Sequence, residues 1–255
     1  MKLKFNLLIF TIFILLFSTC IVYAITVDEI TDKMEEKSPD FTTQKTISEM
    51  ILIDKEGKEE IREMIMFSQK EENDKTSSLM RFLSPRSVRG VTLLNINSGE
   101  RIYLYMPAYD KPRRIAGSSK QEEFMGTGLS YEDMSMDYED KDYEKKLLEE
   151  TVSEYKIEII PSGEDVSYKK IILIVDKENF YAKTVEFYNM SENLTKTLEI
   201  VQIQTDVNGK ITPVEIVFAD IEENHKTKIV IKEIEYNIEL ASDFFSIRTL
   251  SKPTL

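Results

Sequence analysis

Residues 47–67, ISEMILIDKEGKEEIREMIMF, contain two apolar runs separated by a short polar segment. Successive side chains in each run point to opposite faces if the run is a β-strand, so every second residue shares a face, and one of the two faces can pack on a core. The residues that share a face are Ile47, Glu49, Ile51 and Ile53 in the first run and Ile61, Glu63, Ile65 and Phe67 in the second. The segment Asp54-Lys55-Glu56-Gly57 has turn residues, with a glycine to take a positive φ. This stretch therefore predicts a β-hairpin.

The same pattern recurs along most of the chain and predicts an antiparallel meander. Further strands are expected near residues 77–84, 90–97, 101–106, 151–160, 167–176, 181–188, 195–205, 210–219 and 226–236. Asn208-Gly209 is the strongest hairpin signal, and the short polar connections favour a meander over βαβ units. The strands at 102–106 and 171–175 are apolar on both faces. Both faces of the sheet must therefore be covered, and one face could pack on helices while the other lines a cavity.

Helices are expected at two places. Thr26 and Glu29 have the spacing of a capping box, and the helix that follows ends at Pro39. Residues 107–150 interrupt the strand pattern with prolines, glycines and an acidic run. A loop of this length is usually functional or mobile, and a helix over about residues 143–149 is expected to close it. The predicted fold class is mainly β with a few helices.

The first 24 residues have the pattern of a secretory signal peptide. Two lysines precede an apolar run, and Val22-Tyr23-Ala24 forms a small-residue cleavage site. Residues 7–24 are also close to the minimum length of a membrane-spanning helix, so an uncleaved anchor is the alternative. The single cysteine, Cys20, lies in this segment, and its acylation is a further alternative. Cleavage after Ala24 would leave residues 25–255 as one exported domain without a thiol.

The composition limits the classes of partner. Residues 25–255 contain all 46 acidic side chains and 31 basic ones, which gives a formal net charge of −15. Such a surface repels phosphate backbones, which argues against nucleic acid as a partner. Hydrophobic residues make up 42% of the chain, enough for a sizeable core.

No motif in the sequence marks a catalytic site. It has no phosphate-binding glycine loop and no G-x-S-x-G elbow, and its only histidine, His225, lies in a polar segment expected to be exposed. The acidic side chains of residues 132–144 lack EF-hand spacing, so a solvated loop is preferred over a Ca²⁺ site. A carboxylate pair for glycoside hydrolysis is not marked out among so many acids. We therefore expect a binding protein without catalytic residues, metal or cofactor.

The arginines of this acidic chain are the first candidates for a binding site: Arg81, Arg86, Arg89, Arg113 and Arg114. Their planar donor groups suit an anionic headgroup at a cavity mouth. Charge balance, including ion pairs with Glu132 and Asp133, is an equal alternative. Leu93, Ile102, Leu104 and Tyr105 are candidates for the cavity lining, against the alternative of ordinary core packing. The expected ligand-binding residues are Arg81, Leu93, Ile102, Leu104, Tyr105, Arg113 and Arg114.

Three ordered motifs give the sequence a resemblance to a known family. They are LMRFLSP at 79–85 with VRGVTLL at 88–94, IYLYMP at 102–107 followed by Arg113-Arg114-Ile115, and GTGLSYEDM at 126–134. Together they resemble the outer-membrane lipoprotein-sorting protein family, the LolA-like group. The sequence departs from that pattern at Gly126-Thr127-Gly128, where the family tends to have Gly-Ser-Asp, and at Leu129, where an aromatic is common.

This resemblance implies a half-open antiparallel β-barrel capped by helices, with an acyl chain or lipid on its concave face. It implies a carrier in the periplasm or cell envelope that passes lipoproteins or lipids between membrane partners, with a membrane export transporter as the donor. A lipid- or lipoprotein-sensing regulatory module is the alternative, because a similar half-barrel serves that purpose. A carboxylate-dependent hydrolase is the third reading.

Overall fold

A computed structural model describes residues 25–71, 75–136, 143–162 and 166–255. The expected signal peptide and most of the acidic run lie outside the described residues. Within them the chain forms a single 13-stranded sheet. The strands are β1 (Thr43–Ile53), β2 (Glu59–Lys70), β3 (Thr76–Ser84), β4 (Thr92–Ile96), β5 (Arg101–Tyr105), β6 (Arg113–Ile115), β7 (Glu144–Glu150), β8 (Glu154–Ile160), β9 (Tyr168–Asp176), β10 (Ala182–Asn189), β11 (Leu194–Thr205), β12 (Ile211–Asp220) and β13 (His225–Tyr236).

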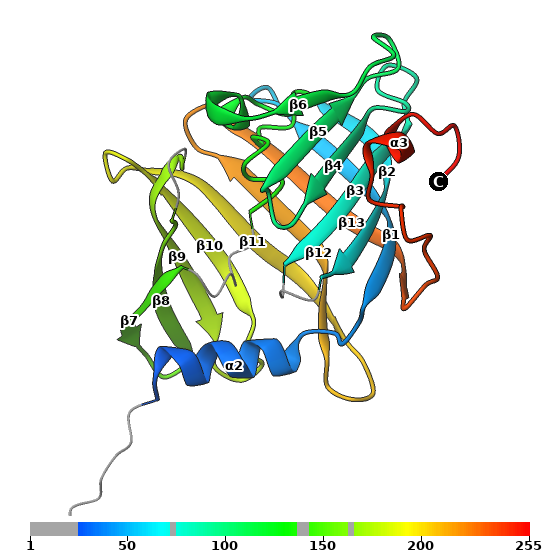
Figure 1. Ribbon diagram of the computed structural model, residues 1–255. Helices are drawn as coiled ribbons and strands as arrows, with labels where there is room; N and C mark the ends of the chain where they lie inside the picture. The colour runs from blue at the N-terminus through cyan, green and yellow to red at the C-terminus, as the bar shows by residue number, and fades with distance from the viewer. Residues whose placement is uncertain (1–24, 72–74, 137–142, 163–165) are drawn as a thin grey trace, which may run out of the picture.

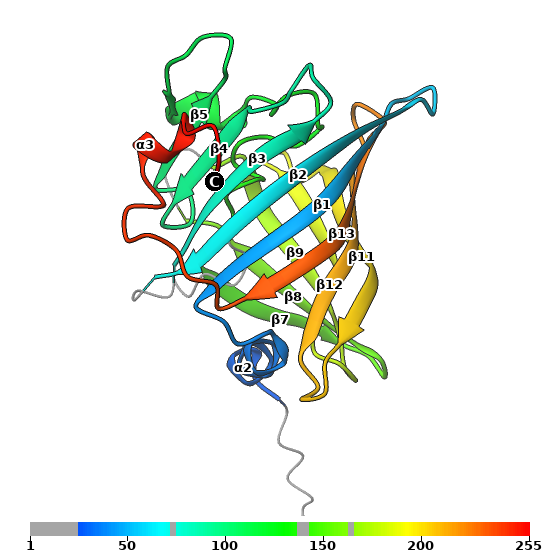
Figure 2. The ribbon, with the colours of Figure 1, turned by 90° about the vertical axis from the view of Figure 1, so that its right-hand side faces the viewer.

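Two meanders make up this sheet, and one long-range pairing joins them. The strand order is β6-β5-β4-β3-β2-β1-β13-β12-β11-β10-β9-β8-β7, with every neighbouring pair antiparallel. The joining pair is β1 with β13, which runs from Gln44 opposite Tyr236 to Ile53 opposite Lys226 with one register shift between Ile47 and Ser48. The resulting sheet is strongly curved (Figures 1 and 2). The prediction of a mainly β antiparallel meander is confirmed.

The predicted helix over residues 143–149 is wrong, because this segment is strand β7. It lies at one edge of the sheet and pairs with β8, from Glu144 opposite Ile160 to Glu150 opposite Tyr155. Its residues are good helix formers, but pairing with a neighbouring strand overrides such a weak local preference. The charged side chains along β7 also suit an edge strand, since they discourage pairing with another chain.

The N-terminal helix α2 (Val27–Lys37) begins and ends as its sequence predicts. The backbone N–H of Glu29 donates to the Thr26 hydroxyl at 3.2 Å, and the Glu29 carboxylate accepts from the Thr26 backbone at 2.8 Å. These two bonds complete the capping box. Ile30 and Met34 are buried on the face that packs against the inner side of β8–β11. Lys210 of the β11–β12 turn donates to the Glu36 carbonyl at 2.9 Å and holds the far end of the helix.

The inner face of the sheet carries two separate cores. The first lies under β1–β6 and is closed by the loop that follows β6, where Phe124 stacks on Phe82 with ring centroids 5.8 Å apart. The second lies under β8–β11 and is closed by α2. Between the two cores, most residues of β12 and β13 are only half-buried. The sheet therefore keeps an open concave region at its centre.

The outer face of β2–β5 is covered by the C-terminal segment, which includes helix α3 (Ile247–Leu250). Phe67 and Phe244 lie with ring centroids 4.9 Å apart, and Leu250 is fully buried against Leu79 and Leu94. Figure 2 shows this segment crossing the strands on the side opposite the concavity. It provides the second covering that the doubly apolar strand β5 requires.

Arg81 fastens the C-terminal segment to the sheet. Its side chain is only 6% exposed and lies on the outer face of β3. The guanidinium donates to the Thr92 hydroxyl at 2.8 Å and to the carbonyls of Thr249, Leu250 and Lys252 at 3.2, 3.0 and 2.8 Å. Burial lowers the pKa of Arg81, but a guanidinium stays charged in proteins, so the carbonyl dipoles must compensate its charge.

Arg81→Ala is expected to lower the free energy of unfolding by about 3 kcal/mol, because it leaves buried carbonyls without donors. Arg114→Ala removes an exposed arginine and is expected to change the free energy of unfolding by less than about 0.5 kcal/mol. Urea unfolding followed by circular dichroism measures both variants. Equal stabilities of the two variants would contradict the fastening role of Arg81.

Candidate functional site

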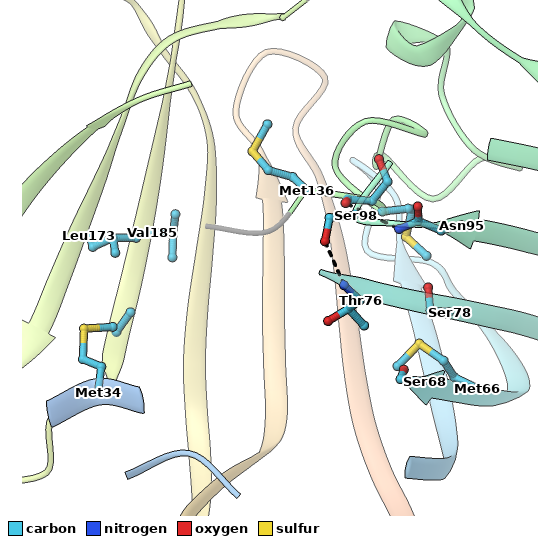
Figure 3. A pocket seen from close by; sticks show the side chains of 13 residues that line it. Met34, Met66, Ser68, Thr76, Ser78, Asn95, Ser98, Met136, Leu173 and Val185 are labelled. Carbon is cyan, nitrogen blue, oxygen red and sulfur yellow. Dashed lines mark hydrogen bonds between the residues drawn. The ribbon is translucent and has the colours of Figure 1, made fainter. Parts of the chain in front are cut away.

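A cavity of about 340 Å³ opens on the concave face between the two cores. Helix α2 lies on one side of it, the inner faces of β2–β4 and β9–β10 form its walls, and residues 134–136 border it (Figure 3). Its lining residues are Met34, Met66, Ser68, Thr76, Ser78, Asn95, Ser98, Met134, Ser135, Met136, Leu173, Ala182 and Val185. This size lies within the roughly 300–1,000 Å³ of typical ligand pockets.

One wall of the cavity is apolar. Leu173 of β9 and Val185 of β10 stand side by side on it, with Met34 and Met136 nearby (Figure 3). Methionine side chains are flexible and polarisable, so they adapt to ligands of varied shape. This wall can take an alkyl chain out of water.

The opposite wall is polar but uncharged. Ser68 of β2, Ser78 of β3 and Asn95 of β4 face the cavity there (Figure 3). At its edge the Ser98 hydroxyl accepts a hydrogen bond from the Thr76 backbone at 3.0 Å. The described lining of the cavity contains no Lys, Arg, Asp or Glu. The cavity therefore offers hydrogen bonds on one side and apolar contact on the other.

A second cavity, of about 200 Å³, lies between the C-terminal end of α2 and strands β10–β12. Met34, Ala182 and Val185 line both cavities. The Met34 side chain of α2 therefore lies at the junction of the two cavities.

The loop that borders the cavity is held by the buried carboxylate of Asp133. It accepts hydrogen bonds from the Ser130 backbone at 2.7 Å, the Tyr168 hydroxyl at 2.5 Å and the Lys196 ammonium at 2.5 Å. Tyr168 and Lys196 belong to β9 and β11, so these bonds join the loop to the second half of the sheet. Asp133 thereby positions Met134 to Met136 against the cavity.

Glu132 lies beside this network and is also buried. Its carboxylate accepts hydrogen bonds from the backbone and the hydroxyl of Ser167. Burial, helped by the charge of Asp133, raises the pKa of Glu132 above its ordinary value of 4.5, although the bonds from Ser167 act in the opposite direction. The solvated acidic loop expected from the sequence is thus wrong for these two residues.

The apolar residues predicted to line the cavity lie elsewhere. Leu93, Ile102 and Leu104 are on the inner face but are packed into the first core under the loop that follows β6. Tyr105 lies on the outer face and contacts the C-terminal covering, with its hydroxyl 3.3 Å from Asp110 Oδ1. Arg81 also lies on the outer face, as described above. None of these five residues is among the described lining residues.

The remaining predicted arginines are at the surface. Arg113 and Arg114 are exposed on β6, and Arg113 lies 3.7 Å from the carboxylate of Glu122. Arg89 donates to the Leu83 carbonyl at 2.9 Å. The alternative of ion pairs between the arginines and Glu132 or Asp133 is wrong, because Asp133 pairs with Lys196 and Glu132 accepts from Ser167. Sequence reasoning missed the serines and methionines of the cavity, whose only signal was their spacing along β2 and β3.

The close approach of His225 to Gly128 accounts for the glycine at this position, where the LolA-like pattern tends to have Asp. Gly128 has a φ of +68°, and a Cβ there would lie 2.7 Å from His225 Nδ1. Any larger residue would collide with the imidazole. The Thr227 hydroxyl donates to the Thr127 carbonyl at 2.6 Å and holds the loop on β13. The expected exposure of His225 is wrong, because its Nδ1 is buried and has no hydrogen-bond partner within the described residues.

Residues 25–71, 75–136, 143–162 and 166–255 contain no group of three or more His, Cys, Asp or Glu side chains arranged to hold a metal ion. Among the helices in these ranges, none has the length and apolar character needed to cross a membrane.

Three solved structures share this fold over most of the chain. A domain described as an outer membrane lipoprotein-sorting protein from Vibrio parahaemolyticus has a TM-score of 0.81 and 23% identity, covering 88% of this chain and 97% of that one. A DUF1329 family protein from Desulfovibrio piger has a TM-score of 0.78, 23% identity and the same coverage. A LolA superfamily protein from Nitrosomonas europaea has a TM-score of 0.70 and 21% identity, covering 88% and 98% of the two chains. No curated protein matches the sequence.

These matches define the class: the chain has the LolA-like fold, as its three motifs predicted. In a separate comparison, a family profile described as "Uncharacterized protein" matches residues 74–252. The chain belongs to that family.

Glu132→Gln is expected to flatten the pH dependence of stability. Because the pKa of Glu132 is raised in the folded protein, the folded state holds this proton more tightly than the unfolded chain. Protonated Glu132 therefore stabilises the folded state. This stabilisation is fully present below about pH 4.5 and is lost as the pH rises through the pKa of Glu132 in the folded protein. Urea unfolding at several pH values should show the variant gaining stability relative to the wild type as the pH rises.

The matched control is Glu178→Gln, which alters an exposed carboxylate. Its stability should run parallel to that of the wild type over the same pH range. A Glu132→Gln profile that also runs parallel to the wild type would show that Glu132 does not carry the effect.

Proposed function

We propose that the protein is an envelope carrier that binds the acyl chains of lipoproteins or lipids in its concave cavity. The observation that carries this proposal is the cavity itself, with an apolar wall of Leu173 and Val185 and adaptable methionines around it. Each methylene that leaves water for such a wall contributes about 0.8 kcal/mol. Binding and release of this kind need no catalytic residue, metal or cofactor.

In this proposal residues 25–255 act as one domain, a half-open β-barrel whose concave side α2 caps. Residues 1–24 direct its export to the periplasm or cell envelope. Helix α2 moves to admit and release cargo, because Met34 stands between the two cavities. The cargo passes between membrane partners, with an export transporter as donor. The description of the Vibrio parahaemolyticus domain as a lipoprotein-sorting protein supports the carrier reading.

Lipid transfer between vesicles tests whether the protein is a carrier. Donor vesicles containing a fluorescent, self-quenched lipid are mixed with unlabelled acceptors, and the protein should accelerate dequenching in proportion to its concentration. Protein that binds lipid stoichiometrically without accelerating transfer would favour the sensing module instead. Protein that neither binds nor transfers lipid would contradict the proposal.

Ala182→Phe is expected to weaken lipid binding at least about tenfold, which corresponds to about 1.4 kcal/mol. Ala182 lines both cavities and is only partly buried at the edge of the second core, so the added ring is expected to occupy the ligand space. Displacement of a fluorescent fatty acid measures the affinity, and thermal unfolding checks the fold.

Ala108→Phe adds the same ring at an exposed turn between β5 and β6 and serves as the control. It should bind the fatty acid like the wild type. If Ala182→Phe folds normally and also keeps wild-type affinity, the ligand does not occupy these cavities.

A further inference from the structure

The polar wall of the cavity is a continuous row set by strand register. Ser68 of β2 is directly opposite Ser78 of β3, and Ser78 is directly opposite Asn95 of β4. The neighbouring row on the same face, two residues further along each strand, is apolar: Met66 is opposite Met80, and Met80 is opposite Leu93. This row places polar side chains next to one another across three neighbouring strands, and Thr76, Ser98 and Ser135 add further polar groups to the lining.

Two hydroxyls of this row are available to a ligand. Within the described residues, the Ser68 and Ser78 hydroxyls make no hydrogen bond, while their residues line the cavity. The only buried side-chain atom without a partner in those residues is His225 Nδ1, so the two hydroxyls are accessible from the cavity. Asn95 adds an amide whose oxygen accepts from the Gly99 backbone at 2.6 Å and whose nitrogen lies 3.5 Å from the Ser135 carbonyl.

The charge around this row disfavours an anion. The described lining residues are all uncharged, and an ionised carboxylate or phosphate is costly to remove from water without a cation or several charge-assisted hydrogen bonds. The adjoining loop adds two buried acidic residues, Glu132 and Asp133. The nearby ammonium of Lys196 is already paired with Asp133 at 2.5 Å. A bound anion would therefore find no cationic side chain among the described lining residues.

We infer that the cavity selects a neutral amphiphile of the glyceride type. Its ester and hydroxyl oxygens would lie on the row of Ser68, Ser78 and Asn95, and its alkyl chain would lie against Leu173 and Val185. A hydroxyl can donate to an ester carbonyl and accept from a glycerol hydroxyl, so serines suit both groups. This inference rests on the proposed function, since it names the chemical class of the ligand that the same cavity binds.

Matched single-chain lipids test the selectivity. Monomyristoylglycerol, myristate and myristoyl lysophosphatidic acid share one acyl chain and differ in charge. Each is titrated below its micellar concentration against protein carrying a fluorescent fatty acid. The neutral lipid is expected to bind at least about tenfold more tightly than either anion, which corresponds to about 1.4 kcal/mol.

The variants Ser68→Ala, Ser78→Ala and the double variant test whether the polar wall causes the preference for the neutral lipid. They should weaken monomyristoylglycerol binding, about threefold to tenfold for the double variant, and leave myristate binding unchanged, because the apolar wall remains intact. Ser87→Ala, at an exposed position, should behave like the wild type. Circular dichroism confirms that each variant is folded.

The outcomes separate the two proposals. Equal binding of the three lipids, preference for an anion, or unchanged selectivity in the double variant would overturn the glyceride inference and leave the carrier proposal standing. Failure of all three lipids to bind the wild-type protein would overturn both.

Discussion

The pairing of β1 with β13 joins the two meanders into one sheet. It joins residues that are nearly the whole length of the described chain apart, from Gln44 opposite Tyr236 to Ile53 opposite Lys226. The Thr42 backbone donates to the Asn237 side chain at 2.9 Å, and the Thr43 hydroxyl donates to the Ile238 carbonyl at 2.7 Å, which secures the end of the pair. Without it, two separate meanders would each expose an edge and an apolar face.

This pairing also decides how the sheet is covered. Helix α2 comes just before β1, and the C-terminal segment comes just after β13, so both leave the sheet at the same end. Helix α2 packs on the inner face, and the C-terminal segment packs on the outer face. Because each half of the sheet closes its own inner core, the space between the cores stays open and forms the cavity. The site is therefore a consequence of the topology rather than of a local motif.

Buried polar groups hold segments in place on both faces of the sheet. On the outer face, the charge of Arg81 is balanced by carbonyls of the C-terminal segment. On the inner face, Asp133 ties the loop after β6 to β9 and β11 and fixes one border of the cavity. Arg81 and Asp133 are both buried and make several hydrogen bonds. Removing their charges from water costs free energy, but their hydrogen bonds fix the positions of the segments that they join.

Local signals in the sequence predicted much of the fold. Alternation located most strands, and the Thr26–Glu29 capping box located α2. Residues 143–149 were mistaken for a helix because their preference is local and weak, whereas the pairing of β7 with β8 is tertiary.

The site was harder to predict, because alternation shows which residues share a face but not which face is concave. Ile47 and Ile51 of β1 lie on the outer side, whereas Ser48 and Met50 are buried on the inner side. The same ambiguity placed Arg81 and Tyr105 at the cavity in the prediction and concealed Ser68 and Ser78. Leu93, Ile102 and Leu104 do face inward, but only the path of the loop after β6 determines that a core fills the space above them.

Methionine methyl NMR can show directly whether a ligand occupies the cavity between the two cores. The chain has 11 methionines. Met34, Met66, Met134 and Met136 line the cavity, Met50 is fully buried in the first core, and Met190 is 63% exposed. Titration with monomyristoylglycerol should shift the four cavity methyl signals and leave those of Met50 and Met190 in place. Saturable binding that leaves the four cavity signals unmoved would contradict the account.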